Sequence, residues 1–150
     1  MVEEGKPAPD FELESDSGET VNLSSFRGTP VVLYFYPKSD TPGCTKQACG
    51  IRDAFDAFRE RGAVVLGVSA DKRESQTKFK AKYNLPFTVL ADPERRAGEA
   101  YGVTKPDSNY FERSTFIIDG EGNVAKIMRR VDPERHAERV LDALAVPATR

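Results

Sequence analysis

The 150-residue sequence predicts an α/β fold in which a mixed central sheet is flanked by helices on both faces. Short aliphatic and aromatic runs of strand length alternate with amphipathic segments whose apolar residues recur every three or four positions. Late in the chain, two strand-like runs flank the turn sequence from Asp119 to Asn123, which predicts an antiparallel hairpin. At this length, residues 1–150 fit a single domain with its own hydrophobic core.

The first half of the chain predicts three strands and one long helix. The strands are expected at residues 11–13, 20–23 and 31–36, and the helix at residues 42–61. The run at 31–36 is aliphatic and aromatic throughout, which is typical of a strand buried on both faces. Four residues continue an apolar stripe from Cys44 along the helix: Ala48, Ile51, Phe55 and Phe58.

The second half predicts four more strands and three helices. The strands are expected at residues 64–68, 88–91, 114–118 and 124–128. Each helix is expected to open at an aspartate, because one aspartate has capping-box spacing to a glutamate and the other two precede a proline. The three aspartates are Asp71, Asp92 and Asp132.

The composition excludes several classes of protein. With 22 basic and 24 acidic residues the net charge is −2, so no basic excess points to nucleic acid or an anionic membrane. The apolar runs are too short to cross a bilayer, and residues 1–6 lack the pattern of a secretory signal, which favours the cytoplasm. In that reducing compartment, two cysteines are expected to be reactive thiols. Two cysteines and one histidine are too few for an all-protein zinc site, so no metal is expected.

Cys44 is the strongest candidate for a functional residue. Thr41 is a favourable N-cap and Pro42 suits the first helical position, so Cys44 falls in the first turn of the predicted helix. Free backbone N–H groups and the positive end of the helix dipole favour an anion there. Because the thiolate is the nucleophilic form of cysteine, this placement predicts a reactive thiol.

Cys49 lies five residues further along the same helix. On an intact helix, positions five apart differ by about 140° in azimuth and about 7.5 Å in height, so their Cα atoms are about 8–9 Å apart. That separation exceeds the reach of a disulfide. Two possibilities stay open: the cysteines never meet, or the first helical turns unwind when they do. The Cys-x4-Cys spacing also differs from the Cys-x2-Cys of thioredoxin-type oxidoreductases.

The residues from Phe35 to Asp53 carry a family resemblance. Pro37, Thr41 and Cys44 form a Pro-x3-Thr-x2-Cys pattern, and Cys49 follows it. This segment resembles the active-site segment of peroxiredoxins, specifically of the bacterioferritin comigratory protein or peroxiredoxin Q subfamily. The resemblance implies a thioredoxin-like fold. It covers nearly the whole chain, with further similar stretches at residues 5–11, 84–93 and 113–119.

The resemblance implies a role for each site residue. Cys44 would attack the terminal oxygen of hydrogen peroxide or an organic hydroperoxide and become a sulfenic acid, with water or an alcohol as product. Cys49 would then resolve this acid as an intramolecular disulfide. Thr41 would hydrogen-bond both the thiolate and the peroxide, and Pro37 would shield the sulfur from solvent. Arg113 would hold the thiolate charged and stabilise the stretched O–O bond.

The same resemblance implies the partners of the reaction. Thioredoxin or a similar dithiol reductant would return both cysteines to thiols. No metal, haem or flavin is expected as a cofactor, because sulfur itself is the redox centre. Since an intramolecular disulfide requires no second chain, a monomer is expected.

Two other functions stay open on the sequence. A non-enzymatic redox sensor would use the same disulfide as a switch, although such a switch needs no peroxide-activating residues like Thr41 and Arg113. A protein disulfide reductase on the same fold is disfavoured by the missing Cys-x2-Cys pattern. Cys49 is also open to an interpretation as an idle helical residue. His136, early in the last predicted helix, is expected on the helix surface rather than as a general base.

Overall fold

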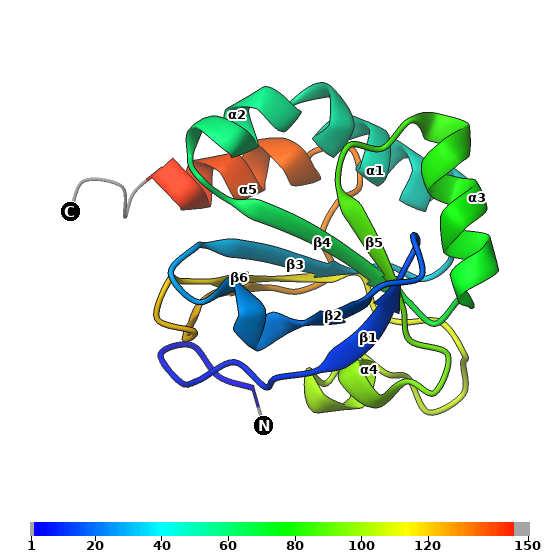
Figure 1. The fold of residues 1–150 in the computed structure, drawn as a ribbon, viewed down its shortest axis with the longest axis horizontal. Coiled ribbons are helices and arrows are strands. Elements are labelled where there is room, and N and C mark those ends of the chain that lie inside the picture. The colour runs from blue at the N-terminus through cyan, green and yellow to red at the C-terminus, as the bar shows by residue number, and fades with distance from the viewer. Residues whose placement is uncertain (1, 146–150) are drawn as a thin grey trace.

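In the computed structural model, which describes residues 2–145, seven strands form one mixed sheet. The strands are β1 (Glu12–Ser15), β2 (Thr20–Asn22), β3 (Val31–Phe35), β4 (Val64–Ser69), β5 (Thr88–Ala91), β6 (Ser114–Ile118) and β7 (Val124–Met128). Their order is β2-β1-β5-β4-β3-β6-β7 (Figure 1). β3 pairs in parallel with β4 but antiparallel with β6, and β6 and β7 form the expected antiparallel hairpin. The predicted mixed sheet is confirmed.

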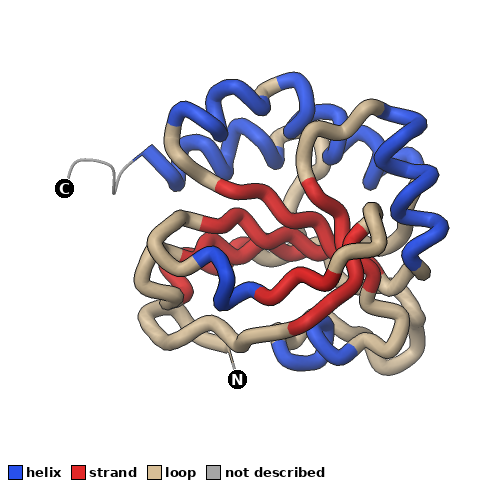
Figure 2. The backbone as a smooth tube through the Cα atoms, viewed as in Figure 1, coloured by secondary structure: helices blue, strands red, loops and turns tan. Residues whose placement is uncertain are grey.

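Helices cover both faces of this sheet, as predicted. The helices are α1 (Pro42–Asp53), α2 (Phe55–Glu60), α3 (Arg73–Tyr83), α4 (Arg96–Ala100) and α5 (His136–Ala145). In Figure 1, α1, α2, α3 and α5 lie above the sheet and α4 lies below it. Figure 2 shows the same layers, with most of the blue helices stacked on one side of the red strands.

Strand β3 separates the two hydrophobic cores of the molecule. All five of its residues are buried, which confirms the prediction of a strand covered on both faces. Val32 and Tyr34 pack with the core under α1, α2, α3 and α5, whereas Leu33 and Phe35 pack with the core on the α4 side. The alternation follows from the two-residue period of a strand. β3 is therefore covered on both faces up to its last residue, Phe35.

The single helix predicted at residues 42–61 is two helices in the structure. α1 ends at Asp53 and α2 begins at Phe55, because the backbone of Ala54 leaves helical geometry at φ −102° and ψ 12°. The Ala54 N–H is shared between the carbonyl groups of Gly50 and Ile51, each at 3.2 Å. No proline or glycine occupies the break, so its position had no local sequence signal.

Asp71 does not open α3, as its spacing to a glutamate had predicted. The helix begins two residues later, at Arg73. The Asp71 carboxylate instead accepts hydrogen bonds from the backbone N–H of Ser39 and from the Ser69 hydroxyl, both at 2.7 Å. This aspartate therefore stabilises the loop before α1 rather than a helix end.

The other two predicted helix starts are also early. α4 begins at Arg96, although the Asp92 carboxylate does accept hydrogen bonds from the backbone N–H groups of Arg96 and Gly98. Asp132 is followed by a turn, and α5 begins at His136. In both places a short turn lies between the aspartate and the first full helical turn.

Candidate active site

Cys44 lies at the start of α1, beside the end of β3. Thr41 occupies the N-cap position with extended backbone angles and Pro42 is the first helical residue, so the predicted placement of Cys44 in the first turn is confirmed. The Cys44 side chain is 1% exposed. The sulfur is thus held at the positive end of a helix and shielded from bulk water.

Arg113 contacts the Cys44 sulfur directly. It precedes β6, and the antiparallel pairing of Ser114 with Phe35 brings it beside the loop that follows β3. Its Nη1 lies 3.4 Å from Cys44 Sγ and donates to Gln47 Oε1 at 2.7 Å. The guanidinium therefore places a fixed positive charge at the sulfur, where it attracts the negative charge of a thiolate. Two residues that are 69 positions apart meet here because of sheet pairing.

Gln47 and Gly43 position this guanidinium. Gln47 is fully buried, and its side-chain oxygen fixes the Nη1 group that faces Cys44. A Cβ atom on Gly43 would lie 2.9 Å from Arg113 Nη2, so a larger residue at this position would displace the arginine. The sequence reasoning missed both residues. Gln47 had one available signal, because positions three apart share one side of a helix.

Thr41 holds the loop rather than the helix end. Its hydroxyl donates to the Lys38 carbonyl oxygen at 2.8 Å, and among the described residues its side chain makes no capping bond to α1. The predicted N-cap position is confirmed, but the predicted side-chain cap is wrong. With its hydrogen directed to Lys38, the hydroxyl oxygen keeps lone pairs for a donor that approaches Cys44.

Pro37 is half-buried and lies two residues after the end of β3. It lines a cavity of about 430 Å³, together with residues of the loops that follow β4 and β5. The other lining residues are Lys38, Ala70, Asp71, Lys72, Pro93, Arg95, Asn109 and Tyr110. The cavity places open space next to the loop that leads to Cys44.

Cys49 is half-buried and lies one and a half turns further along α1. Both cysteines are free thiols, and α1 is continuous from Pro42 to Asp53. In an unbroken helix their Cα atoms are about 8–9 Å apart, too far for a disulfide. The two possibilities from the sequence, cysteines that never meet or a helix start that unwinds, therefore both remain.

The expectation that His136 lies on the helix surface is wrong. The side chain is fully buried between α5 and the sheet, with Nε2 2.6 Å from Thr115 Oγ1 and its ring 5.4 Å from that of Tyr34. His136, Val140 and Leu144 are all buried along one side of α5, which is the i, i+4, i+8 spacing of a core stripe. Burial, with a smaller contribution from the positive charge of Arg113, lowers the pKa of His136 to about 3.

We expect the free energy of unfolding to decrease by about 2 kcal/mol between pH 7 and pH 5. The pKa of His136 is about 3 in the folded protein and 6.5 in the unfolded chain, so only the unfolded state binds a proton in this range. The contribution of His136 to the free energy of unfolding is complete above pH 6.5 and is lost as the pH falls towards 3. Urea unfolding at both pH values measures the loss, and His136→Gln, which keeps a polar partner for Thr115, should show a smaller one. An equal loss in both proteins would contradict this assignment.

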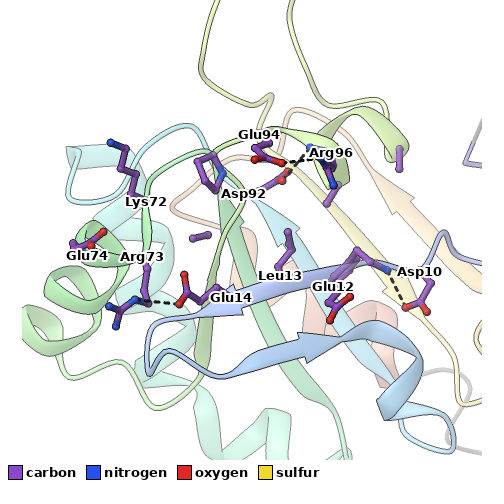
Figure 3. A pocket seen from close by; sticks show the side chains of 15 residues that line it. Asp10, Glu12, Leu13, Glu14, Lys72, Arg73, Glu74, Asp92, Glu94 and Arg96 are labelled. Carbon is purple, nitrogen blue, oxygen red and sulfur yellow. Dashed lines mark hydrogen bonds and ion pairs between the residues drawn. The ribbon is translucent and has the colours of Figure 1, made fainter.

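A larger cavity, of about 730 Å³, shares Lys72 and Pro93 with the cavity beside Pro37 (Figure 3). It is bounded by β1, the start of α3 and the segment that contains α4, and neither cysteine lines it. Its arginines are paired, with Arg73 3.3 Å from Glu14 and Arg96 3.1 Å from Glu94. Since neither cysteine lines this cavity, the candidate active site is the region around Cys44.

Two further properties concern the described part of the chain. Across residues 2–145, no group of three or more His, Cys, Asp or Glu side chains is arranged to hold a metal ion. Within the same residues, no helix has the length and apolar character needed to span a bilayer.

Comparison with known proteins identifies the family of this chain. The AhpC/TSA family profile matches residues 4–127. The chain belongs to this family. Peroxiredoxin Bcp of Bacillus subtilis (strain 168) is 48% identical to it in an alignment of 149 positions that covers 95% of each protein. Chloroplastic peroxiredoxin Q of Oryza sativa subsp. japonica is 42% identical in an alignment of 150 positions that covers 95% of this chain and 67% of that protein.

Solved structures of peroxiredoxins have the same fold. Peroxidoxin BcpB from Mycobacterium tuberculosis is 32% identical, with a TM-score of 0.90 over 100% of this chain and 99% of that one. The bacterioferritin comigratory protein of Xanthomonas campestris is 33% identical, with a TM-score of 0.88 over 92% of each chain. The predicted thioredoxin-like fold and the resemblance to the Bcp and peroxiredoxin Q subfamily are thereby confirmed. This peroxiredoxin is a thiol-dependent peroxidase.

Proposed function

We propose that this peroxiredoxin reduces hydrogen peroxide and organic hydroperoxides through attack by Cys44. The observation that carries the proposal is the contact of 3.4 Å between Cys44 Sγ and Arg113 Nη1 at the start of α1. The Cys44 thiolate attacks the terminal oxygen, the O–O bond breaks, and sulfur becomes a sulfenic acid. The departing alkoxide or hydroxide takes up a proton and leaves as alcohol or water. The related protein of Xanthomonas campestris is described for alkyl peroxide reduction.

The neighbouring side chains assist this step. The Arg113 guanidinium stabilises the negative charge that develops on the departing oxygen, which is worth most in a site shielded from water. The Thr41 hydroxyl, which donates to Lys38, accepts a hydrogen bond from the peroxide O–H and so orients it. Pro37 limits the access of water to the sulfur.

Cys49 completes the cycle in this proposal. Its thiol attacks the Cys44 sulfenic acid, the S–O bond breaks, and the thiol proton leaves with the hydroxyl group as water. The first turns of α1 unwind so that the two sulfur atoms meet, because the intact helix keeps them too far apart. A thioredoxin-like dithiol then reduces the Cys44–Cys49 disulfide and is itself oxidised. The cycle needs no second chain, so we propose a monomer acting in a reducing compartment such as the cytoplasm.

A peroxide-reduction assay coupled to thioredoxin tests the proposal, with mass spectrometry on each product. We expect Cys44→Ser to lose all turnover, because the nucleophile is gone. Cys49→Ser should consume one equivalent of peroxide, form a stable sulfenic acid and stop. Wild-type protein that forms the disulfide but does not turn over would favour a redox sensor or a different reductant. Unchanged turnover in Cys49→Ser would contradict its role in resolution.

A further inference from the structure

A closed ring of hydrogen bonds lies beside the loop between β3 and α1. We call it the Ser39 ring, and its members are Ser39, Ser69, Asp71 and Gln76. The Ser39 hydroxyl donates to Gln76 Oε1 at 2.7 Å, and Gln76 Nε2 donates to Ser69 Oγ at 3.1 Å. The Ser69 hydroxyl and the Ser39 N–H both donate to Asp71 Oδ2, each at 2.7 Å. Each member is bonded to two others, so none moves independently.

Gln76 makes two of the four bonds in the ring and two more outside it. Besides the ring bonds, its Oε1 accepts from the Tyr36 hydroxyl at 2.6 Å and its Nε2 donates to the Leu90 carbonyl. The side-chain amide therefore uses two acceptor and two donor positions, and a flipped amide would set its oxygen against the Leu90 carbonyl oxygen, two acceptors that cannot bond. Gln76 and Ser69 are fully buried and Ser39 is 8% exposed. A satisfied buried network of this kind holds one conformation.

Ser39 connects this buried network to the active-site loop. The other ring members belong to the end of β4, to the loop after it and to α3, whereas Ser39 stands between Pro37 and Thr41, five residues before Cys44. The next residue, Asp40, has a left-handed backbone with φ 59°, and its carboxylate bonds only to partly exposed side chains on α3. Pairs as exposed as these contribute little to stability. The ring is thus a stronger attachment of the loop than the bonds of Asp40.

We propose that Ser39 and Gln76 are positioning residues for the peroxide. The inference rests on the proposed function, because it concerns the same reaction at Cys44. The ring holds the loop so that Thr41 and Pro37 stand where the peroxide binds, whereas Arg113 and α1 hold the sulfur itself. Loosening the loop therefore misplaces the peroxide and leaves the thiolate in place. A displacement of about 1 Å in such a contact lowers a rate by up to about 100-fold.

The test compares two reactions of the same sulfur in Ser39→Ala. We expect the second-order rate constant of Cys44 with hydrogen peroxide to fall about tenfold, because Thr41 no longer orients the O–O bond. Alkylation of Cys44 by iodoacetamide depends on the thiolate and not on that orientation, so its rate should stay within about twofold of wild type. A general loss of structure would change both rates.

Tyr36→Phe is the matched control. It removes the other hydroxyl donor to Gln76 Oε1 and leaves the loop attached through Ser39. In either variant Gln76 Oε1 keeps one donor, so the losses in melting temperature should be similar. Only Ser39→Ala should react more slowly with peroxide. Equal slowing in both variants, or a wild-type rate in Ser39→Ala, would overturn the inference while the proposed function stands. A wild-type protein that does not reduce peroxide would overturn the proposed function, and this inference with it.

Discussion

Arg113→Ala is expected to lower the rate of peroxide reduction by about 100- to 1,000-fold while the protein remains folded. The guanidinium is the positive group that contacts the Cys44 sulfur, at 3.4 Å. In the transition state, negative charge moves from sulfur to the departing oxygen, and a fixed cation beside both atoms stabilises that charge without reorganisation. Removing one such hydrogen-bond donor from a site shielded from water typically lowers the rate by about 100- to 1,000-fold. Gln47 loses its partner at the same time, which lowers stability but does not remove the core.

Stopped-flow measurement of Cys44 oxidation gives this rate, and circular dichroism checks the fold. Arg113→Lys separates charge from shape, because lysine keeps the cation but cannot contact Cys44 and Gln47 with one planar group. We expect it to restore only part of the rate. Arg129→Ala is the control, since Arg129 bonds to the Gly102 carbonyl and packs over Phe116. A near-normal rate in Arg113→Ala, or an equal loss in Arg129→Ala, would contradict the role of Arg113.

Local sequence rules predict the part of this site at the start of α1, but not Arg113 or Gln47. Thr41, Pro42 and Cys44 follow from the capping and proline preferences of a helix start, and the structure has them at those positions. Arg113 has no such local signal, because its contact with Cys44 depends on the pairing of β6 with β3. Its position became predictable only through the resemblance to a family. Its hydrogen-bond partner Gln47 was missed, since a polar residue on a buried helix side resembles a surface residue until its partner is known.

In the fold too, the features with a local sequence signal were predicted and the features without one were missed. Each strand lies within two residues of its predicted bounds, because burial on one or two faces produces a clear pattern of apolar residues in short segments. The break at Ala54 was missed because no proline or glycine marks it, and the late start of α3 was missed because it depends on contacts made elsewhere. Asp71 is an example, because its capping capacity is used by Ser39 and Ser69. His136 could have been placed correctly from its spacing to Val140, but its polarity favoured the surface.

Formation of the Cys44–Cys49 disulfide is expected to abolish amide-exchange protection in the first turns of α1. The helix cannot keep its geometry when its two cysteines are joined, because their Cα atoms must approach from about 8–9 Å to about 5.5–6 Å. The N–H groups that bond within this segment, beginning with Thr45 to the Thr41 carbonyl, then become open to water. Their exchange should approach that of a fraying helix end. The contact between Cys44 and Arg113 is lost as well.

Hydrogen exchange on reduced and oxidised protein measures this change segment by segment. Protection should persist in β4 and β5, which the disulfide does not touch, and at the Ser39 N–H, which the buried ring holds. Cys49→Ser treated with the same peroxide is the control, because it stops at the sulfenic acid and should keep α1 protected. A disulfide that forms with unchanged protection between Cys44 and Cys49 would contradict the unwinding. Loss of protection that begins before Ser39 would mean that the loop, and not the start of α1, is where the chain opens.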